Sequence, residues 1–203
     1  GDRATAIRVL ANRQGGKSLR ALIRFAGDPD DAVAKAAMEA LKDVAPAEAM
    51  PAIVQLMLNA PSSARARQAM DASVSVLRRS PDPEATVAVL TEALAKADAS
   101  AQSMIYKVLV QAGSDAALAP VAAASRSDDA ELRSPAISAL SSWRETNAVD
   151  PLLELAANPN LELKEHALAI RGLARLLGGS DRPDLKACEK GLEAARRPDE
   201  KRL

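Results

Sequence analysis

The stretch Ala37-Met38-Glu39-Ala40-Leu41 is one copy of a five-residue phrase that returns along the chain. Each copy has a small or apolar residue, a large apolar one, a polar one, a small one and then usually leucine. The other copies are Ala6-Ile7-Arg8-Val9-Leu10, Ala69-Met70-Asp71-Ala72-Ser73, Ile105-Tyr106-Lys107-Val108-Leu109, Ala136-Ile137-Ser138-Ala139-Leu140 and Ala169-Ile170-Arg171-Gly172-Leu173. Their last positions lie 31, 32, 36, 31 and 33 residues apart. Such a period is typical of stacked helical hairpins.

The composition agrees with helices that pack closely against one another. Hydrophobic residues make up 48% of the 203 residues, yet there is only one Phe, one Tyr and one Trp. Ala and Leu favour helices, and small side chains let two helices approach. We therefore predict an all-α fold, an α-α superhelix of about six helical hairpins in which each hairpin buries its apolar face against its neighbours.

Turn signals rich in Gly, Pro, Asp and Ser separate the periodic stretches. We predict second helices of the pairs at 3–12, 31–44, 63–79, 98–112, 129–144 and 161–177. The first helices of the following pairs are expected at 17–26, 48–58, 84–96, 116–125, 148–157 and 182–196. Because one period runs throughout, we predict a single domain at 2–203.

The chain resembles the HEAT-repeat family. The likeness rests on the phrases above and on Asp-rich turns before the second helices, such as Asp28-Pro29-Asp30-Asp31 and Asp128-Asp129. It implies antiparallel helix pairs stacked in a curved solenoid. Many family members carry an Arg early in the second helix; Arg133 has this place here, whereas the matching positions elsewhere are Ala34, Ala66, Gln102 and His166. A continuous ladder of arginines is therefore not expected.

A narrower resemblance concerns the C-terminal part. Residues 167–176, followed by 196–203, are similar to a HEAT module found in large multidomain bacterial proteins. This resemblance implies that the chain is a fragment of a longer protein, and that another repeat follows Leu203.

The charge balance bears on the partners. Lys plus Arg equals Asp plus Glu, 27 of each, so the chain has no net field that would gather polyanions or anionic lipid. Its apolar runs are far shorter than the roughly 20 residues that span a bilayer. We therefore expect no nucleic-acid partner and no membrane partner.

The residues that could carry chemistry are few. His166 is the only imidazole, which excludes a two-histidine metal site, and Lys164 and Glu165 beside it predict a polar helix surface. Cys188 is the only cysteine and is expected to be a half-buried structural thiol. The stretch 11–18 loosely follows a phosphate-loop pattern but comes after a helical phrase instead of a strand. We predict no enzyme, no catalytic residue, no cofactor and no metal.

A noncatalytic interaction or spacer scaffold is the function that the repeats favour. Equivalent positions of stacked hairpins line up across one surface, so polar phrase positions and those one turn earlier should face outward together. This candidate partner-binding face is Arg8, Lys35, Glu39, Arg67, Asp71, Lys107, Ser138 and Arg171. Its alternating charges suit a protein partner or a neighbouring domain of the parent chain. We expect the chain to be a monomer.

Two other interpretations remain open. The mixed charges could serve only to keep a long helical surface soluble. Alternatively, the chain could be a HEAT-like enzyme or ligand carrier, because the family resemblance extends to alkylated-DNA glycosylases and bilin-handling proteins. That function would require a pocket holding Trp143 or Tyr106 beside an acid and several arginines. Trp143 could also anchor an interface, but packing between repeats is the favoured interpretation.

Overall fold

The computed structural model describes residue 7 and residues 16–179 and 184–200. Every regular element in these ranges is helical, with eleven α-helices and two short 3-10 helices. The chain divides into two compact units, Gly1–Val108 and Leu109–Leu203, which are described separately below. The all-α prediction is confirmed. The helix predicted at 3–12 lies, apart from residue 7, outside the described residues.

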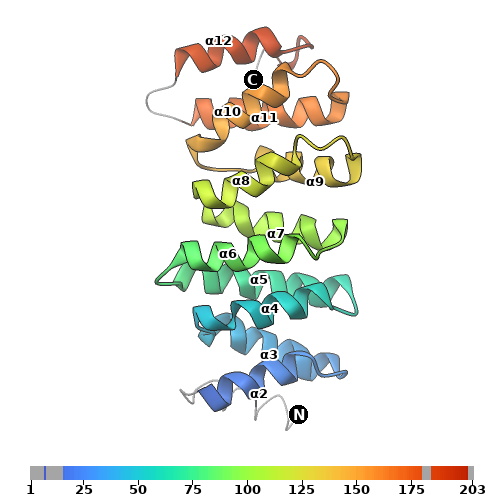
Figure 1. The fold of residues 1–203 in the computed structure, drawn as a ribbon, viewed down its shortest axis with the longest axis vertical. Helices are drawn as coiled ribbons and strands as arrows, with labels where there is room; N and C mark the ends of the chain where they lie inside the picture. Colours follow the sequence, from blue (N-terminus) through green and yellow to red (C-terminus); the bar gives the residue numbers. More distant parts are fainter. Residues whose placement is uncertain (1–6, 8–15, 180–183, 201–203) are drawn as a thin grey trace. The chain divides into compact units, whose positions relative to one another are not determined.

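The first unit is built from helix pairs that follow one another in sequence order (Figure 1). Helix α2 packs against α3 and α4 against α5, while α3 also packs on α5 and α4 on α6. Its elements are α2 (Gly16–Ala26), α3 (Asp31–Val44), η1 (Ala47–Ala49), α4 (Met50–Leu58), α5 (Ser63–Arg79), α6 (Pro83–Leu94) and most of α7 (Ala99–Ala112). Each helix of a pair thus packs both on its partner and on a helix of the next pair.

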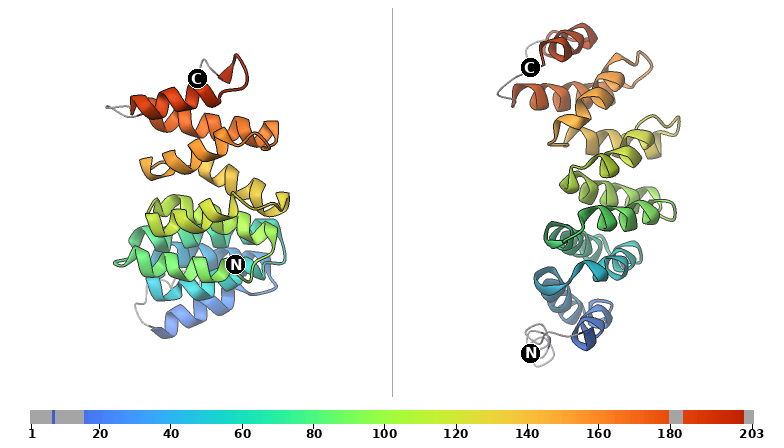
Figure 2. Two further views of the ribbon diagram at one scale, coloured as in Figure 1. Left: turned by 45° about the horizontal axis from the view of Figure 1, so that its top comes forward. Right: turned by 60° about the vertical axis from the view of Figure 1, so that its left-hand side comes forward.

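The second unit repeats this arrangement (Figure 2). Helix α8 packs against α9 and α10 against α11, while α9 packs on α11 and α12 closes against both α10 and α11. Its elements are α8 (Asp115–Ala124), α9 (Ala130–Ser141), η2 (Thr146–Ala148), α10 (Val149–Ala157), α11 (Leu163–Gly178) and α12 (Leu185–Ala194). Within each unit, the predicted pairing of antiparallel helices is therefore observed.

Local capping explains where the helices begin and end. The carboxylate of Asp30 accepts a hydrogen bond of 2.9 Å from the amide of Ala32, so α3 begins at the predicted residue. The helix predicted at 48–58 instead starts as η1 and continues as α4, which has proline in its first turn. The helix predicted at 129–144 ends at Ser141, because the chain turns at Ser142.

The repeated phrase supplies the seam between pairs. Its first position is 0% exposed in every copy whose first residue is described: Ala37, Ala69, Ile105, Ala136 and Ala169. The third copy ends in Ser73, which is also fully buried and donates its hydroxyl to the carbonyl of Ala69 at 2.9 Å. Leu77, one turn later, is buried beside it. Small residues at these positions let neighbouring second helices pack closely.

Arginine side chains tie neighbouring pairs together through backbone carbonyls. In the first unit, Arg65 Nη1 donates to the carbonyl of Asp28 at 2.7 Å, and Arg79 Nη2 to that of Ala45 at 3.2 Å. In the second unit, Arg175 Nη2 donates to the carbonyl of Ser141 at 3.0 Å. The donors lie 34 to 37 residues from their acceptors, about one repeat. Since carbonyls at turns and helix ends lack intrahelical partners, these contacts satisfy them.

Helices α9 and α11 approach closely at Gly172, the small position of its phrase copy. A Cβ added there would lie 2.8 Å from the Cα of Ser141 and 3.3 Å from the Leu152 side chain. Gly178 lies on the same helix, and an added Cβ there would meet nothing within 4 Å. The two glycines therefore separate the effect of packing from that of backbone freedom.

We expect Gly172→Ala to lower the free energy of unfolding by about 1–2 kcal/mol, because the clash outweighs the gain in helix propensity. Gly178→Ala should leave it unchanged or raise it by up to about 1 kcal/mol. Urea denaturation followed by circular dichroism compares the two variants. Equal effects would contradict the close approach of α9 and α11.

Candidate partner-binding groove

The structure places every described residue of the predicted partner-binding face in solvent. Lys35 and Glu39 lie on α3, Arg67 and Asp71 on α5, and Lys107 on α7, all in the first unit. Ser138 on α9 and Arg171 on α11 are the exposed members in the second unit. Arg8 lies outside the described residues.

A groove in the first unit brings two of these residues together. Arg67 and Lys107 both line it, together with the end of α4, the turn after α4, and the first turns of α5 and α7. Its volume is about 450 Å³. The other described members of the face lie outside its lining. The groove lies between the two second helices whose phrase copies are separated by the longest step in the sequence.

The base of the groove is apolar. Met57, Ala66 and Ala101 are buried in it, whereas Met70 and Met104 are half-buried and present part of their side chains to solvent. Methionine is unbranched and has a polarizable sulfur, so it adapts to apolar groups of different shapes. Four serines line the groove as well: Ser62, Ser63, Ser100 and Ser103.

The charges of the groove are uneven. Arg67 and Lys107 are exposed, and neither makes an ion pair or hydrogen bond within the described part of the chain. The third charged group, Asp98, accepts a hydrogen bond of 2.8 Å from the amide of Ala101 and so caps α7. The groove therefore carries one net positive charge, and its two cations have no partner among the described residues.

Arg65 shows the contrast on the same helix, only two residues before Arg67. Its guanidinium lies 2.7 Å from the carboxylate of Asp31 and also binds the carbonyls of Asp28 and Pro29. Arg65 is therefore used to hold two repeats together, whereas Arg67 is left in solvent.

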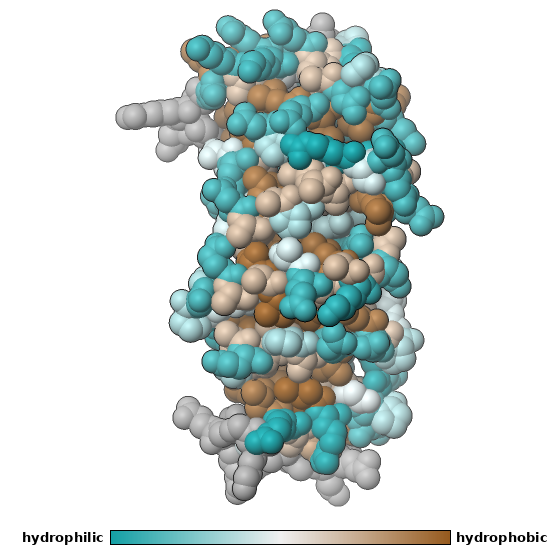
Figure 3. All heavy atoms as spheres, in the orientation of Figure 1, coloured by the Kyte–Doolittle hydropathy of each residue, from teal (hydrophilic) through white to brown (hydrophobic). Residues whose placement is uncertain are grey.

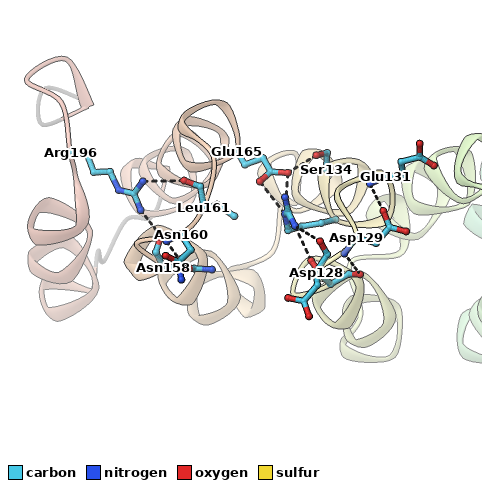
Figure 4. A network of polar contacts seen from close by, with 11 residues as sticks. Asp128, Asp129, Glu131, Ser134, Asn158, Asn160, Leu161, Glu165 and Arg196 are labelled. Carbon is cyan, nitrogen blue, oxygen red and sulfur yellow. Dashed lines mark hydrogen bonds and ion pairs between the residues drawn. The ribbon is translucent and has the colours of Figure 1, made fainter.

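A second, smaller hollow of about 350 Å³ lies in the second unit, between the turn after α8 and the turn after α10. Both arginines of its lining are paired: Arg126 Nε lies 3.0 Å from Glu154 Oε2, and Arg133 Nε lies 3.1 Å from Glu165 Oε2. Figure 4 shows how the neighbouring polar groups point toward one another, with Ser134 also donating to Glu165. This network joins repeats and engages both arginines of the hollow.

His166 is completely buried, so the predicted polar helix surface was wrong for it. Glu165 beside it is buried as well, because Arg133 covers its carboxylate. The His166 Nε2 lies 3.1 Å from the carbonyl of Ala194, which can only accept, so this nitrogen carries a proton. Nδ1 faces Glu200 Oε1 at 3.4 Å, and neither of these two atoms has another partner.

The pair can attract only if a proton lies on one of its two facing atoms. The other oxygen of Glu200, Oε2, accepts from the amides of Arg196 at 2.9 Å and Arg197 at 3.1 Å. The carboxyl therefore ties the turn after α12 to the buried imidazole on α11. It is a structural contact, since no solvent reaches His166.

We expect Glu200→Gln to keep the stability of the second unit, because the amide oxygen can accept from the two backbone amides while its N–H₂ donates to Nδ1. Glu200→Ala should lower the free energy of unfolding by about 1–3 kcal/mol, since buried polar groups lose their partners. Thermal and urea unfolding compare the two variants. An equal loss in both would contradict a hydrogen bond between the side chain at position 200 and His166 Nδ1.

The other residues considered from the sequence are packed inside their units. Trp143 is fully buried, and its indole Nε1 donates to Asn147 Oδ1 at 2.9 Å, which confirms the packing interpretation. Tyr106 is buried, and this burial raises the pKa of its phenol. Neither aromatic side chain lines either hollow described above. Cys188 is half-buried on α12, as predicted.

Within the described ranges, no three His, Cys, Asp or Glu side chains gather as a metal site would require. Nor does any helix there combine the length and the apolar character needed to cross a bilayer.

Comparison with protein families identifies the N-terminal part of the chain. The family model described as HEAT repeats matches residues 2–73, which include α2, α3, α4 and the first part of α5. Comparison with the curated proteins gives no match.

Several solved structures are similar over most of the chain. The crystal structure of an engineered protein has 20% sequence identity, covers 87% of this chain and 91% of its own, and gives a TM-score of 0.42. A second engineered protein has 20% identity, with 95% and 57% covered and a TM-score of 0.43. Human deoxyhypusine hydroxylase in complex with glycerol has 19% identity, with 98% and 79% covered and a TM-score of 0.40. These scores are too low to support a conclusion about activity.

Proposed function

The chain carries HEAT repeats in residues 2–73, and on this premise we propose that it is a noncatalytic scaffold that binds a protein partner through its exposed second-helix face. Its partner is another protein or a neighbouring domain of the parent chain. The observation that carries the proposal is the pair of unpartnered cations, Arg67 and Lys107, in a groove with a methionine base. Groups that only hold the stack together, such as Arg65, are paired instead.

The mixed character of the surface supports a protein partner over a polyanion. The polar phrase positions carry charges of both signs, with Glu39 and Asp71 between the cations Arg8 and Lys107. Over the face drawn in Figure 3, hydrophilic and hydrophobic residues are interspersed. Since the chain has 27 basic and 27 acidic residues, we propose that it binds neither nucleic acid nor membrane. We also propose that it is monomeric and, because one repeat period runs throughout, that residues 2–203 act as one domain.

The enzyme or ligand-carrier alternative receives less support. It requires an aromatic side chain in an open pocket beside an acid and several arginines. Trp143 and Tyr106 are buried, and both arginines of the second hollow, Arg126 and Arg133, are already paired with carboxylates. The hydroxylase named above shares too little similarity to add to this alternative.

Charge reversal tests the proposed face. In affinity capture from an extract of the source organism, we expect Arg67→Glu/Lys107→Glu/Arg171→Glu to lose a defined set of captured proteins by about tenfold or more, because reversed charges repel a complementary partner. Quantitative mass spectrometry compares this variant with the wild type.

The matched control is Arg144→Glu/Lys186→Glu/Lys190→Glu, which changes the charge equally at three exposed residues off the face. It should capture the wild-type set. The proposal is contradicted if both variants capture that set unchanged, or if both lose it equally. Circular dichroism verifies that each variant is folded.

A further inference from the structure

The groove between α5 and α7 combines an apolar methionine surface with two exposed cations, and a single peptide segment could contact both. We propose that it binds a short stretch of the partner protein in which a large apolar side chain is flanked by Asp or Glu. The apolar side chain lies on the methionines, and the carboxylates face Arg67 and Lys107. This inference rests on the proposed scaffold function and names the chemistry of its partner.

The apolar base provides the contact area for such a side chain. Met57 and Ala101 close the base, and the half-buried Met70 and Met104 can shift around an incoming group. A volume of about 450 Å³ lies within the range of small-ligand sites and holds a large side chain with its neighbouring backbone. Flexible methionine surfaces accept varied apolar partners, so the exact side chain is less constrained than its apolar character.

The charges of the groove determine which residues can flank the apolar side chain of the bound peptide. Arg67 and Lys107 have no anionic partner in the described structure, and Asp98 is committed to the amide of Ala101. The lining also includes the first turns of α5 and α7, where backbone amides carry partial positive charge. A carboxylate placed here gains attraction from both cations, whereas a basic segment would be repelled.

The lining also argues against other anions. It contains no aromatic side chain on which a nucleic-acid base could stack, and a free phosphate held by the serines and the two cations would leave the methionine side chains uncovered. A competing occupant is α12 of a second copy, since Leu185 and Leu192 are exposed there near Glu189 and Glu193. We favour a separate partner, and the test below distinguishes the two.

Selection from a displayed library of random peptides tests this inference without knowledge of the partner. The wild-type chain, immobilised, should enrich peptides with an apolar residue flanked by Asp or Glu. The strongest peptide, labelled with a fluorophore, is then titrated by anisotropy. We expect Arg67→Glu/Lys107→Glu to raise the Kd of this peptide by about a hundredfold. Met70→Gln/Met104→Gln should raise it by about tenfold. Higher salt should weaken binding to the wild type.

Lys186→Glu/Lys190→Glu is the matched control and should bind as the wild type does. The inference is overturned if no sequence class is enriched, if enriched peptides are basic or lack an apolar residue, or if the groove variants bind normally. It is also overturned if sedimentation shows a wild-type dimer that Arg67→Glu/Lys107→Glu dissociates. Loss of captured proteins with the face variant, together with failure here, would leave the scaffold function standing and refute only the groove chemistry.

Discussion

Burial between neighbours is the constraint on which each unit depends. A helix pair of this chain has an apolar seam on two sides, and only the pairs before and after it can cover both. The first phrase positions are therefore alanine or isoleucine and are fully buried, as Ala37, Ala69 and Ala136 show. At Gly172, a fourth phrase position, α9 lies so close that there is no room even for a Cβ. The small side chains set how closely the pairs stack.

Polar contacts between repeats supply hydrogen bonds that the apolar packing cannot supply. Turns between helices leave backbone carbonyls without partners, and arginines from the next repeat, such as Arg65 and Arg175, donate to them. An arginine used in this way is unavailable to a partner protein. The distinction between Arg65 and Arg67 follows directly, since only the second is left in solvent with its charge uncompensated. The proposed binding and the stacking thus use different side chains of the same helix.

The repeat phrase predicted most of the fold, because the period depends on local residue size and helix propensity. Helix bounds at 31–44 and 63–79 were predicted correctly, whereas α4 begins at Met50 after a short 3-10 helix and a turn shortens α9. The exposed positions of the face were also predictable from the period. The groove was not, because it depends on side chains from three helices. Its one sequence signal was the long step after Ser73. His166 was misjudged for a similar reason: the Glu200 that buries it lies 34 residues away.

Thiol labelling of single cysteines tests the central claim, that positions one repeat apart are equivalent places in neighbouring pairs. In a Cys188→Ser background, cysteine replaces the first phrase position in four copies, Ala37, Ala69, Ala136 and Ala169, and the polar position in the same copies, Glu39, Asp71, Ser138 and Arg171. We predict that all four first-position cysteines are protected in the folded chain and that all four polar-position cysteines react as freely as in a peptide. Protection that varied without regard to phrase position would contradict the account.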